Sequence, residues 1–160
     1  MALVLNGDNK TVLQVVQTVY NTKSSTTSTS WATLFSATIT PTSLSSQILV
    51  GVNFSGSHAD NYSGLVRVLR NSTAIGGGVG GGSYETNNWF NIRNMNDYSI
   101  HTYFASHLDT PSTTSPITYN VQWQATGGIA FYANRTINDA GTQAYDSPVA
   151  SSITLMEISG

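Results

Sequence analysis

The 160-residue sequence predicts an all-β domain of the sandwich or jelly-roll type. Serine, threonine and asparagine fill about a third of the chain. These residues suit pleated, solvated strands better than helices, where their side chains compete for backbone groups. Apolar residues also recur with a period of two, which is the period of a strand with one buried face. Hydrophobic residues reach 39% of the chain, which suffices for the core of one domain.

The first four predicted strands lie between polar loops. The tract 23–30 is rich in serine and threonine and is interpreted as a loop, and Pro41 ends the second strand. The segments and their shared faces are 12–20, with Leu13, Val15 and Val19; 31–39, with Trp31, Thr33, Phe35, Ala37 and Ile39; 48–54, with Ile48, Val50, Val52 and Phe54; and 65–70, which is apolar on both faces.

Four further segments complete a set of eight strands, with a weaker ninth at 84–92. The tripeptide Thr126-Gly127-Gly128 predicts a tight hairpin turn, because two glycines accept the positive φ of a primed turn. Residues 12–160 are therefore expected to form one β-sandwich, preceded by an extended arm at 1–11. The four segments are 100–108, with Ile100, Thr102, Phe104 and Leu108 on one face; 119–125, with Tyr119, Val121 and Trp123; 129–133, with Ile129 and Phe131; and 153–158.

The composition argues against several classes of function. Charged residues make up 9% of the chain and the net charge is −2, so the chain lacks the basic stripe that nucleic-acid binding requires. It contains no cysteine, which removes disulfides and thiol catalysis. No apolar run approaches the ~20 residues of a membrane-spanning helix, and the start lacks the features of a signal peptide. We therefore expect a protein made in a cytoplasm that contacts neither nucleic acid nor membrane.

No motif for catalysis or for a cofactor stands out. The glycine-rich run 76–82 is followed by neither a helix pattern nor a lysine, so a loop or close packing against a neighbouring chain is favoured over phosphate binding. His101 and His107 lie about 20 Å apart along one strand, too far to share an ion within a subunit. His58 and Asp60 are interpreted as an exposed surface pair. We expect no enzyme activity, no cofactor and no metal site.

The last predicted strand indicates contact with another subunit. Ile153 and Leu155 face one way and Met156 and Ile158 the other, so both faces carry large apolar groups. A sandwich strand normally keeps one face wet. We therefore expect Met156 and Ile158, together with Tyr132, at a contact between copies of the chain in a closed cyclic assembly.

Three groups of residues resemble small virion proteins of tailed bacteriophages, as found in marine and cyanobacterial phages. The resemblance covers nearly the whole chain after the arm and rests on structural rather than catalytic motifs. It implies an eight-stranded, tumour-necrosis-factor-like jelly roll that forms a homotrimer on a virion, either as a tail-fibre module or as a capsid decoration. The groups are Val12-Leu13-Gln14-Val15-Val16-Gln17 with the tract 24–31; 39–43 with 45–50; and Asn134-Arg135-Thr136 with 151–157.

The resulting hypothesis is a non-enzymatic, homotrimeric decoration or cement protein that binds the shell of a phage capsid, with the major capsid protein as its partner. Leu3, Val4 and Leu5 in the arm are the expected shell contacts. The alternative is a receptor-binding tail-fibre tip that recognises carbohydrate on the host surface through exposed aromatic and amide side chains. In both cases the protein would be a virion component made in a bacterial cytoplasm. The candidate glycan contacts are Tyr62, Tyr84, Asn87, Trp89 and Tyr98.

Overall fold

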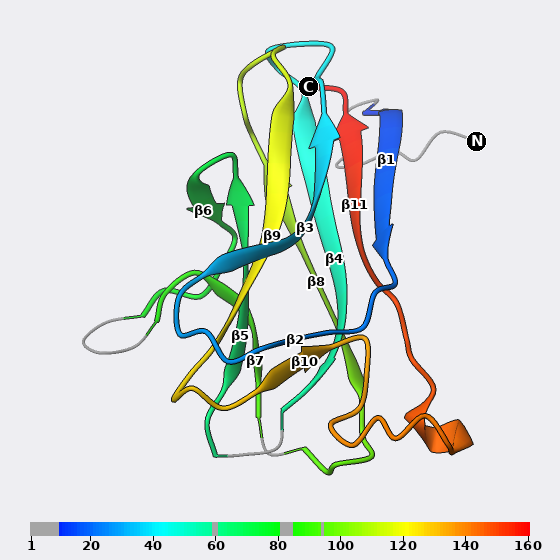
Figure 1. Cartoon of the computed structure of the whole chain (residues 1–160). Helices are drawn as coiled ribbons and strands as arrows, with labels where there is room; N and C mark the ends of the chain where they lie inside the picture. The colour runs from blue at the N-terminus through cyan, green and yellow to red at the C-terminus, as the bar shows by residue number, and fades with distance from the viewer. Residues whose placement is uncertain (1–9, 59–60, 81–84, 94) are drawn as a thin grey trace.

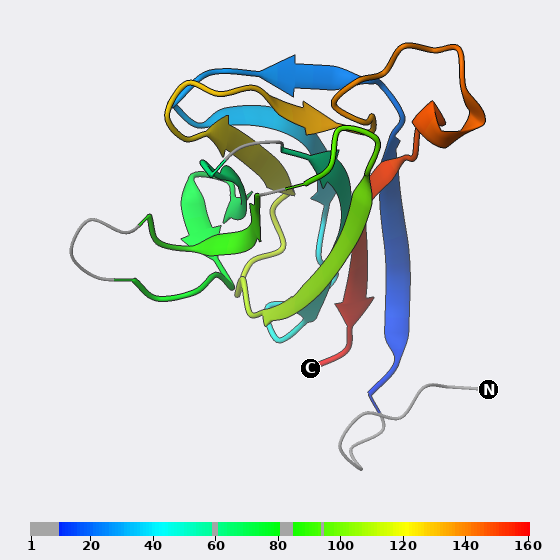
Figure 2. The same cartoon turned by 90° about the horizontal axis from the view of Figure 1, so that it is seen from below.

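The computed structural model describes residues 10–58, 61–80, 85–93 and 95–160. Its strands form two curved antiparallel sheets that pack face to face (Figures 1 and 2). Within the described residues the elements are β1 (Val12–Tyr20), β2 (Ser24–Thr26), β3 (Ala32–Ile39), β4 (Gln47–Ser57), β5 (Gly64–Arg70), β6 (Thr73–Ile75), β7 (Asn88–Ile92), β8 (His101–Asp109), β9 (Ile117–Ala125), β10 (Phe131–Ala133), the 3-10 helix η1 (Ala144–Asp146) and β11 (Ser151–Ile158).

The order of strands differs between the two sheets. In the first sheet, β11 lies between β1 and β4, and β8 pairs with the other edge of β4. At the lower end of Figure 1, β10 pairs with the end of β4 and carries β2 on its other side. In the second sheet, β9 lies between β3 and β5, and β5 also pairs with β6 and β7. The prediction of an all-β sandwich is confirmed.

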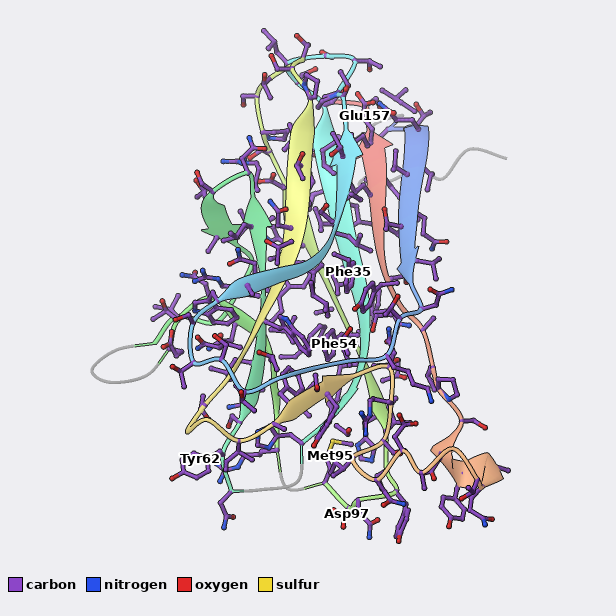
Figure 3. The ribbon with its side chains drawn as sticks, in the orientation of Figure 1. Phe35, Phe54, Tyr62, Met95, Asp97 and Glu157 are labelled. Atoms are coloured by element: carbon purple, nitrogen blue, oxygen red, sulfur yellow. The ribbon has the colours of Figure 1, made fainter. Side chains whose placement is uncertain are left out.

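The core fills the space between the two sheets. The alternation predicted in the third segment is confirmed, because its four apolar side chains on β4 are fully buried. Phe54 contacts Phe131 with ring centroids 5.6 Å apart, and Trp123 contacts the same ring at 5.5 Å. Phe35 and Phe54 both point between the sheets in Figure 3. The β-branched and aromatic residues that favour strands thus also supply the buried area.

The predicted apolar faces of β1 and β8 point to solvent instead of the core. Val15 and Val19 are exposed, while Val16 and Tyr20 on the opposite face of β1 pack against the core. On β8, Phe104 and Leu108 are exposed, and Tyr103 and Ala105 pack inward. Both strands carry apolar residues on both faces, so the period alone could not choose the inner one. The outer apolar face that results is described below.

A β-bulge corrects the prediction for 31–39. Trp31 and Thr33 were expected to share a face with Phe35, but the pairing of β3 with β9 shifts between Thr33 and Phe35. The extra residue reverses the alternation. Trp31 and Thr33 therefore lie outside, where the Arg67 guanidinium stacks 4.2 Å from the Trp31 ring and Thr33 accepts a hydrogen bond from Gln122.

Three shorter segments also differ from expectation. The polar tract 23–30 contains β2, and the strand expected at 129–133 is the three-residue β10. Gly127 and Gly128 adopt the expected positive φ of 65° and 71°. Their turn, however, connects β9 of the second sheet to β10 of the first, so it is not a hairpin. The weaker ninth strand corresponds to β7, which pairs with β5 in the second sheet.

Candidate functional site

The surface of interest is the solvent side of the first sheet, which we call the outer face. It comprises the outward side chains of four neighbouring strands, and in the described residues none of them carries a charge. Antiparallel register brings these side chains into rows that cross the sheet. The outer face consists of Leu13, Val15, Gln17 and Val19 on β1; Ser152, Thr154 and Met156 on β11; Leu49, Gly51 and Asn53 on β4; and Thr102, Phe104, Ser106 and Leu108 on β8.

One row of the outer face is apolar from edge to edge. Val15 pairs with Met156, Met156 with Leu49, and Leu49 with Leu108. Val15 is 55% exposed and Leu108 is 44% exposed. Phe104, further along β8, is 70% exposed. Large side chains gathered in this way, outside a core that is already complete, mark an interaction surface.

A shallow groove of about 190 Å³ runs along the middle of the outer face. A β-carbon built on Gly51 would lie 3.4 Å from Cε2 of Phe104, so the phenyl ring lies over this glycine. The floor and walls are therefore mostly hydrocarbon, with two hydroxyls at the rim. The groove is lined by Leu49, Gly51, Phe104, Ser106, Thr154 and Met156.

The solvent side of the second sheet is polar by contrast. Thr38 and Thr118 share a hydrogen bond of 2.9 Å, and the Asn120 amide donates to the carbonyl of Asn71 at 3.1 Å. Arg67 donates twice to Oε1 of Gln122, at 3.0 and 2.9 Å. These side chains satisfy one another and remain solvated. The molecule thus presents one broad side that is uncharged and crossed by a row of apolar side chains, and one broad side that is polar.

A buried carboxylate, that of Glu157, lies near the upper end of the first sheet in Figure 3. Glu157 is fully buried. Its Oε1 accepts hydrogen bonds from the backbone N–H and hydroxyl of Thr42, both 2.7 Å, and its Oε2 accepts one from Gln14 at 2.6 Å. Burial alone would raise the pKa of this carboxyl, but the hydroxyl and amide donors around it outweigh that effect, and the groups of Ser46, Gln14 and Thr42 lower the pKa to about 2.

A second polar cluster joins the two sheets. Asp109, at the end of β8, accepts hydrogen bonds from the Tyr119 hydroxyl at 2.7 Å and from Arg70 at 2.9 Å. Burial, followed by the hydrogen bond to Asp109 and its charge, raises the pKa of Tyr119 far above its usual value. The hydroxyl therefore stays protonated and acts as a donor, which suits a structural role.

The predicted contacts between copies lie in three different settings. Met156 is half-buried at the centre of the outer face. Ile158 is only 2% exposed within the single chain, so it has little area left for a partner. Tyr132, on β10, is partly covered by the Arg135 guanidinium, 4.7 Å from its ring. The expected shell contacts, Leu3, Val4 and Leu5, lie outside the described residues.

The predicted glycan contacts divide between two regions. Tyr62 lies in a loop at the lower end of the molecule, and Tyr98 follows Asp97, which Figure 3 shows at the same end. Both tyrosines are about half exposed. Asn87 and Trp89 instead flank the start of β7, and the Trp89 indole donates to the carbonyl of Ile75 at 2.6 Å. Tyr84 lies outside the described residues. These residues were predicted as one set of glycan contacts, but the structure places them in two separate regions.

Other side chains were missed or misplaced by sequence reasoning. Tyr145 on η1 makes an edge-to-face contact with Tyr98, with ring centroids 5.2 Å apart and both rings exposed. His58, expected at the surface, is fully buried against Phe131, and Asp60 lies outside the described residues. Within the described ranges, no group of three His, Asp or Glu side chains could hold a metal ion. No helix there is long and apolar enough to cross a membrane.

No protein-family model matches the chain, and no curated protein matches it in sequence. Among solved structures it is similar to the T=1 particles derived from infectious bursal virus, with a TM-score of 0.48 and 12% identity over 92% of this chain. The VP2 subviral particle of infectious bursal disease virus gives 0.46 and 10% over 92%. The Gt strain of that virus gives 0.45 and 14% over 93%. The chain spans only 39 to 40% of the length of those proteins.

Proposed function

We propose that this protein is a non-enzymatic structural component of a virion that assembles as a homotrimer and decorates or cements a capsid shell. The proposal rests on one observation. The outer face is uncharged and carries exposed apolar side chains, although the core between the two sheets is already filled. In a closed ring of three copies, this surface can pack against a neighbouring copy without burying a charge of its own. Met156 and Phe104 would lie within that contact.

The strand order supports the same proposal. Without the short strands β2, β6 and β10, the first sheet reads β1-β11-β4-β8 and the second β3-β9-β5-β7. This is the order expected of an eight-stranded jelly roll, an architecture used by capsid proteins. The resemblance of segments such as 12–17 and 151–157 to phage virion proteins points the same way. The polar side of the second sheet would then face solvent.

The arm is the proposed contact with the shell. Lys10 donates to Gln47 Oε1 at 3.0 Å. The Thr11 N–H donates to the Ser159 hydroxyl and the Ser159 N–H donates to the Thr11 carbonyl, so the chain is fixed to the sandwich from residue 10 onward. Three linked arms would bind a shell far more tightly than one, through their high effective concentration. The shell assembled with these contacts would be more stable by mass action.

Deleting residues 1–9 is expected to leave a folded trimer that binds shells at least about tenfold more weakly, because the three arm contacts act together. Co-sedimentation with purified shells that lack this protein measures the effect. A variant with Leu3, Val4 and Leu5 replaced by serine should behave in the same way. If either variant binds shells as well as the intact protein does, the arm is not the shell contact.

The exposed tyrosine pair at the lower end favours one second candidate, a glycan-binding tip. Tyr98 and Tyr145 present aromatic surface, and the exposed side chains of Asp97 and Asn138 lie in adjoining turns linked by a backbone hydrogen bond of 3.0 Å. Aromatic rings stack on sugar faces and such polar groups bind hydroxyls. Antibody labelling of virions in negative stain separates the two functions, because decoration places the label on the head and a glycan-binding tip places it on the tail.

A further inference from the structure

The outer edge of β1 is a second feature that pairs with no other strand in the part of the chain that the structure describes. In the first sheet β1 pairs only with β11, and among the described residues no strand lies on its other side. Figures 1 and 2 show β1 at the flank of the molecule with β11 inside it. An edge strand presents a row of backbone N–H and C=O groups that can pair with another chain.

This edge lacks the usual protection against such pairing. Natural edge strands are short, bulged, or interrupted by proline or lysine. β1 runs for nine residues, Val12–Tyr20, and contains neither proline nor a charged residue. Its only irregularity is a register shift near Val12, at the end where the strand begins. From Gln14 to Tyr20 the edge is regular and uncharged.

The sequence of β1 is self-complementary in one antiparallel register. If Gln17 faces Gln17 of a second copy, Val15 faces Val19 and Val16 faces Thr18. Valine thus meets valine on the outer face, and two side chains of nearly equal shape meet on the inner face. Moving the axis to Val16 would instead place Val15 opposite Gln17, which pairs an apolar with a polar side chain.

The side chain of Gln17, at the centre of this register, can form hydrogen bonds both within its own chain and to the second copy. Gln17 uses one N–H in a bond to Thr154 Oγ1 at 2.9 Å. Its second N–H and its oxygen remain for the same amide of the partner, in a reciprocal pair. A two-fold axis at Gln17 keeps the outer faces of both copies on the same side, so Val15 at the edge of one apolar row meets Val19 of the other copy.

From this geometry we propose that two copies of the chain pair antiparallel along β1, about a two-fold axis at Gln17, to form one continuous sheet. The contact uses backbone groups at the edge, whereas the proposed trimer uses side chains on the outer face. The edge contact therefore goes beyond the proposed function and can link one trimer to the next. The occupant of the edge is a second copy of this chain.

Single-cysteine variants test this register, because the chain contains no cysteine of its own. Facing residues of an antiparallel pair lie ~5 Å apart between Cα atoms, within the range of a disulfide. Under mild oxidation, Gln17→Cys is expected to form a covalent dimer at least about tenfold faster than the exposed control Thr38→Cys, because pairing raises the effective concentration. A mixture of Val15→Cys and Val19→Cys should also crosslink, and neither variant alone should.

The result is read independently of the trimer. Adding Phe104→Glu, which disrupts the outer face, should leave the Gln17→Cys crosslink unchanged. The proposal is overturned if Gln17→Cys crosslinks no faster than Thr38→Cys, or if Val15→Cys alone crosslinks as fast as the mixture. Circular dichroism of each variant checks that the sandwich is folded. We expect it to fold, because the substituted side chains lie at the surface.

Discussion

Replacing Asn134 with alanine is expected to lower the free energy of unfolding by about 4 kcal/mol. The Asn134 amide is fully buried and donates to the carbonyls of Tyr20 and Thr22 at 2.8 and 3.1 Å. Its oxygen accepts from Ser151, whose hydroxyl in turn accepts from the N–H of Ser55. Alanine would leave several of these buried groups without partners, and each such loss costs about 1–3 kcal/mol.

Two control variants separate the causes of this loss. Asn134 has a φ of 61°, which asparagine tolerates and alanine does not, so Asn134→Gly should recover about 1 kcal/mol of the difference. Asn87 also has a positive φ, 63°, but it is only partly buried and its amide donates to the adjacent Thr86 hydroxyl, so Asn87→Ala should cost no more than about 1 kcal/mol. Urea unfolding of the three variants measures the differences. Equal losses in Asn134→Ala and Asn87→Ala would show that backbone strain, and not the buried network, dominates.

Acid is expected to destabilise the protein through Glu157. The folded-state pKa of about 2 lies below the ordinary value of 4.5, so the carboxylate stabilises the folded state fully above about pH 5. This contribution, at most about 3 kcal/mol, is lost as the pH falls toward 2. The physical reason is that protonation removes an acceptor from the Thr42 and Gln14 hydrogen bonds.

Glu157→Gln should therefore be less stable than the natural chain at pH 7 and nearly as stable at pH 2. The glutamine amide places an N–H group against one of the present donors, which breaks that bond at every pH. Asp97→Asn, at an exposed position, serves as the matched control and should change little. Thermal unfolding at several pH values between 2 and 7 gives the result. A gap between Glu157→Gln and the natural chain that stays constant with pH would contradict this account.

The sequence located most strands but not the orientation of their faces. Composition and alternation were sufficient for β4, where one face is wholly apolar. In β1, Val15 and Val16 offer apolar side chains in both directions, so the choice of the inner face depends on pairing with β11. No glycine or proline marks the bulge at Thr33 in the sequence. The bulge depends on how β3 pairs with β9.

The candidate site was predictable in part. Met156 was identified from the apolar residues on both faces of its strand, and it lies at the centre of the outer face. Phe104 was placed on an apolar face, but that face was not recognised as an exposed one. The hydrogen-bond donors to Glu157, and the carbonyls of Tyr20 and Thr22 that accept from Asn134, lie more than a hundred residues away along the chain. Such contacts follow from the register of the folded sheets and leave no local pattern.

Association through the outer face is the central claim, and the mass of the protein in solution tests it most directly. Native mass spectrometry and light scattering of the natural chain should give three times the subunit mass of 17.1 kDa, or a multiple of that mass where β1 edges link trimers. Phe104→Glu should weaken association at least about 100-fold, because it buries an unpaired charge in the contact. Thr38→Glu, on the polar side of the second sheet, should leave the trimer intact. A natural chain that stays at one subunit mass at every concentration, or a Phe104→Glu variant that remains trimeric, would contradict the claim.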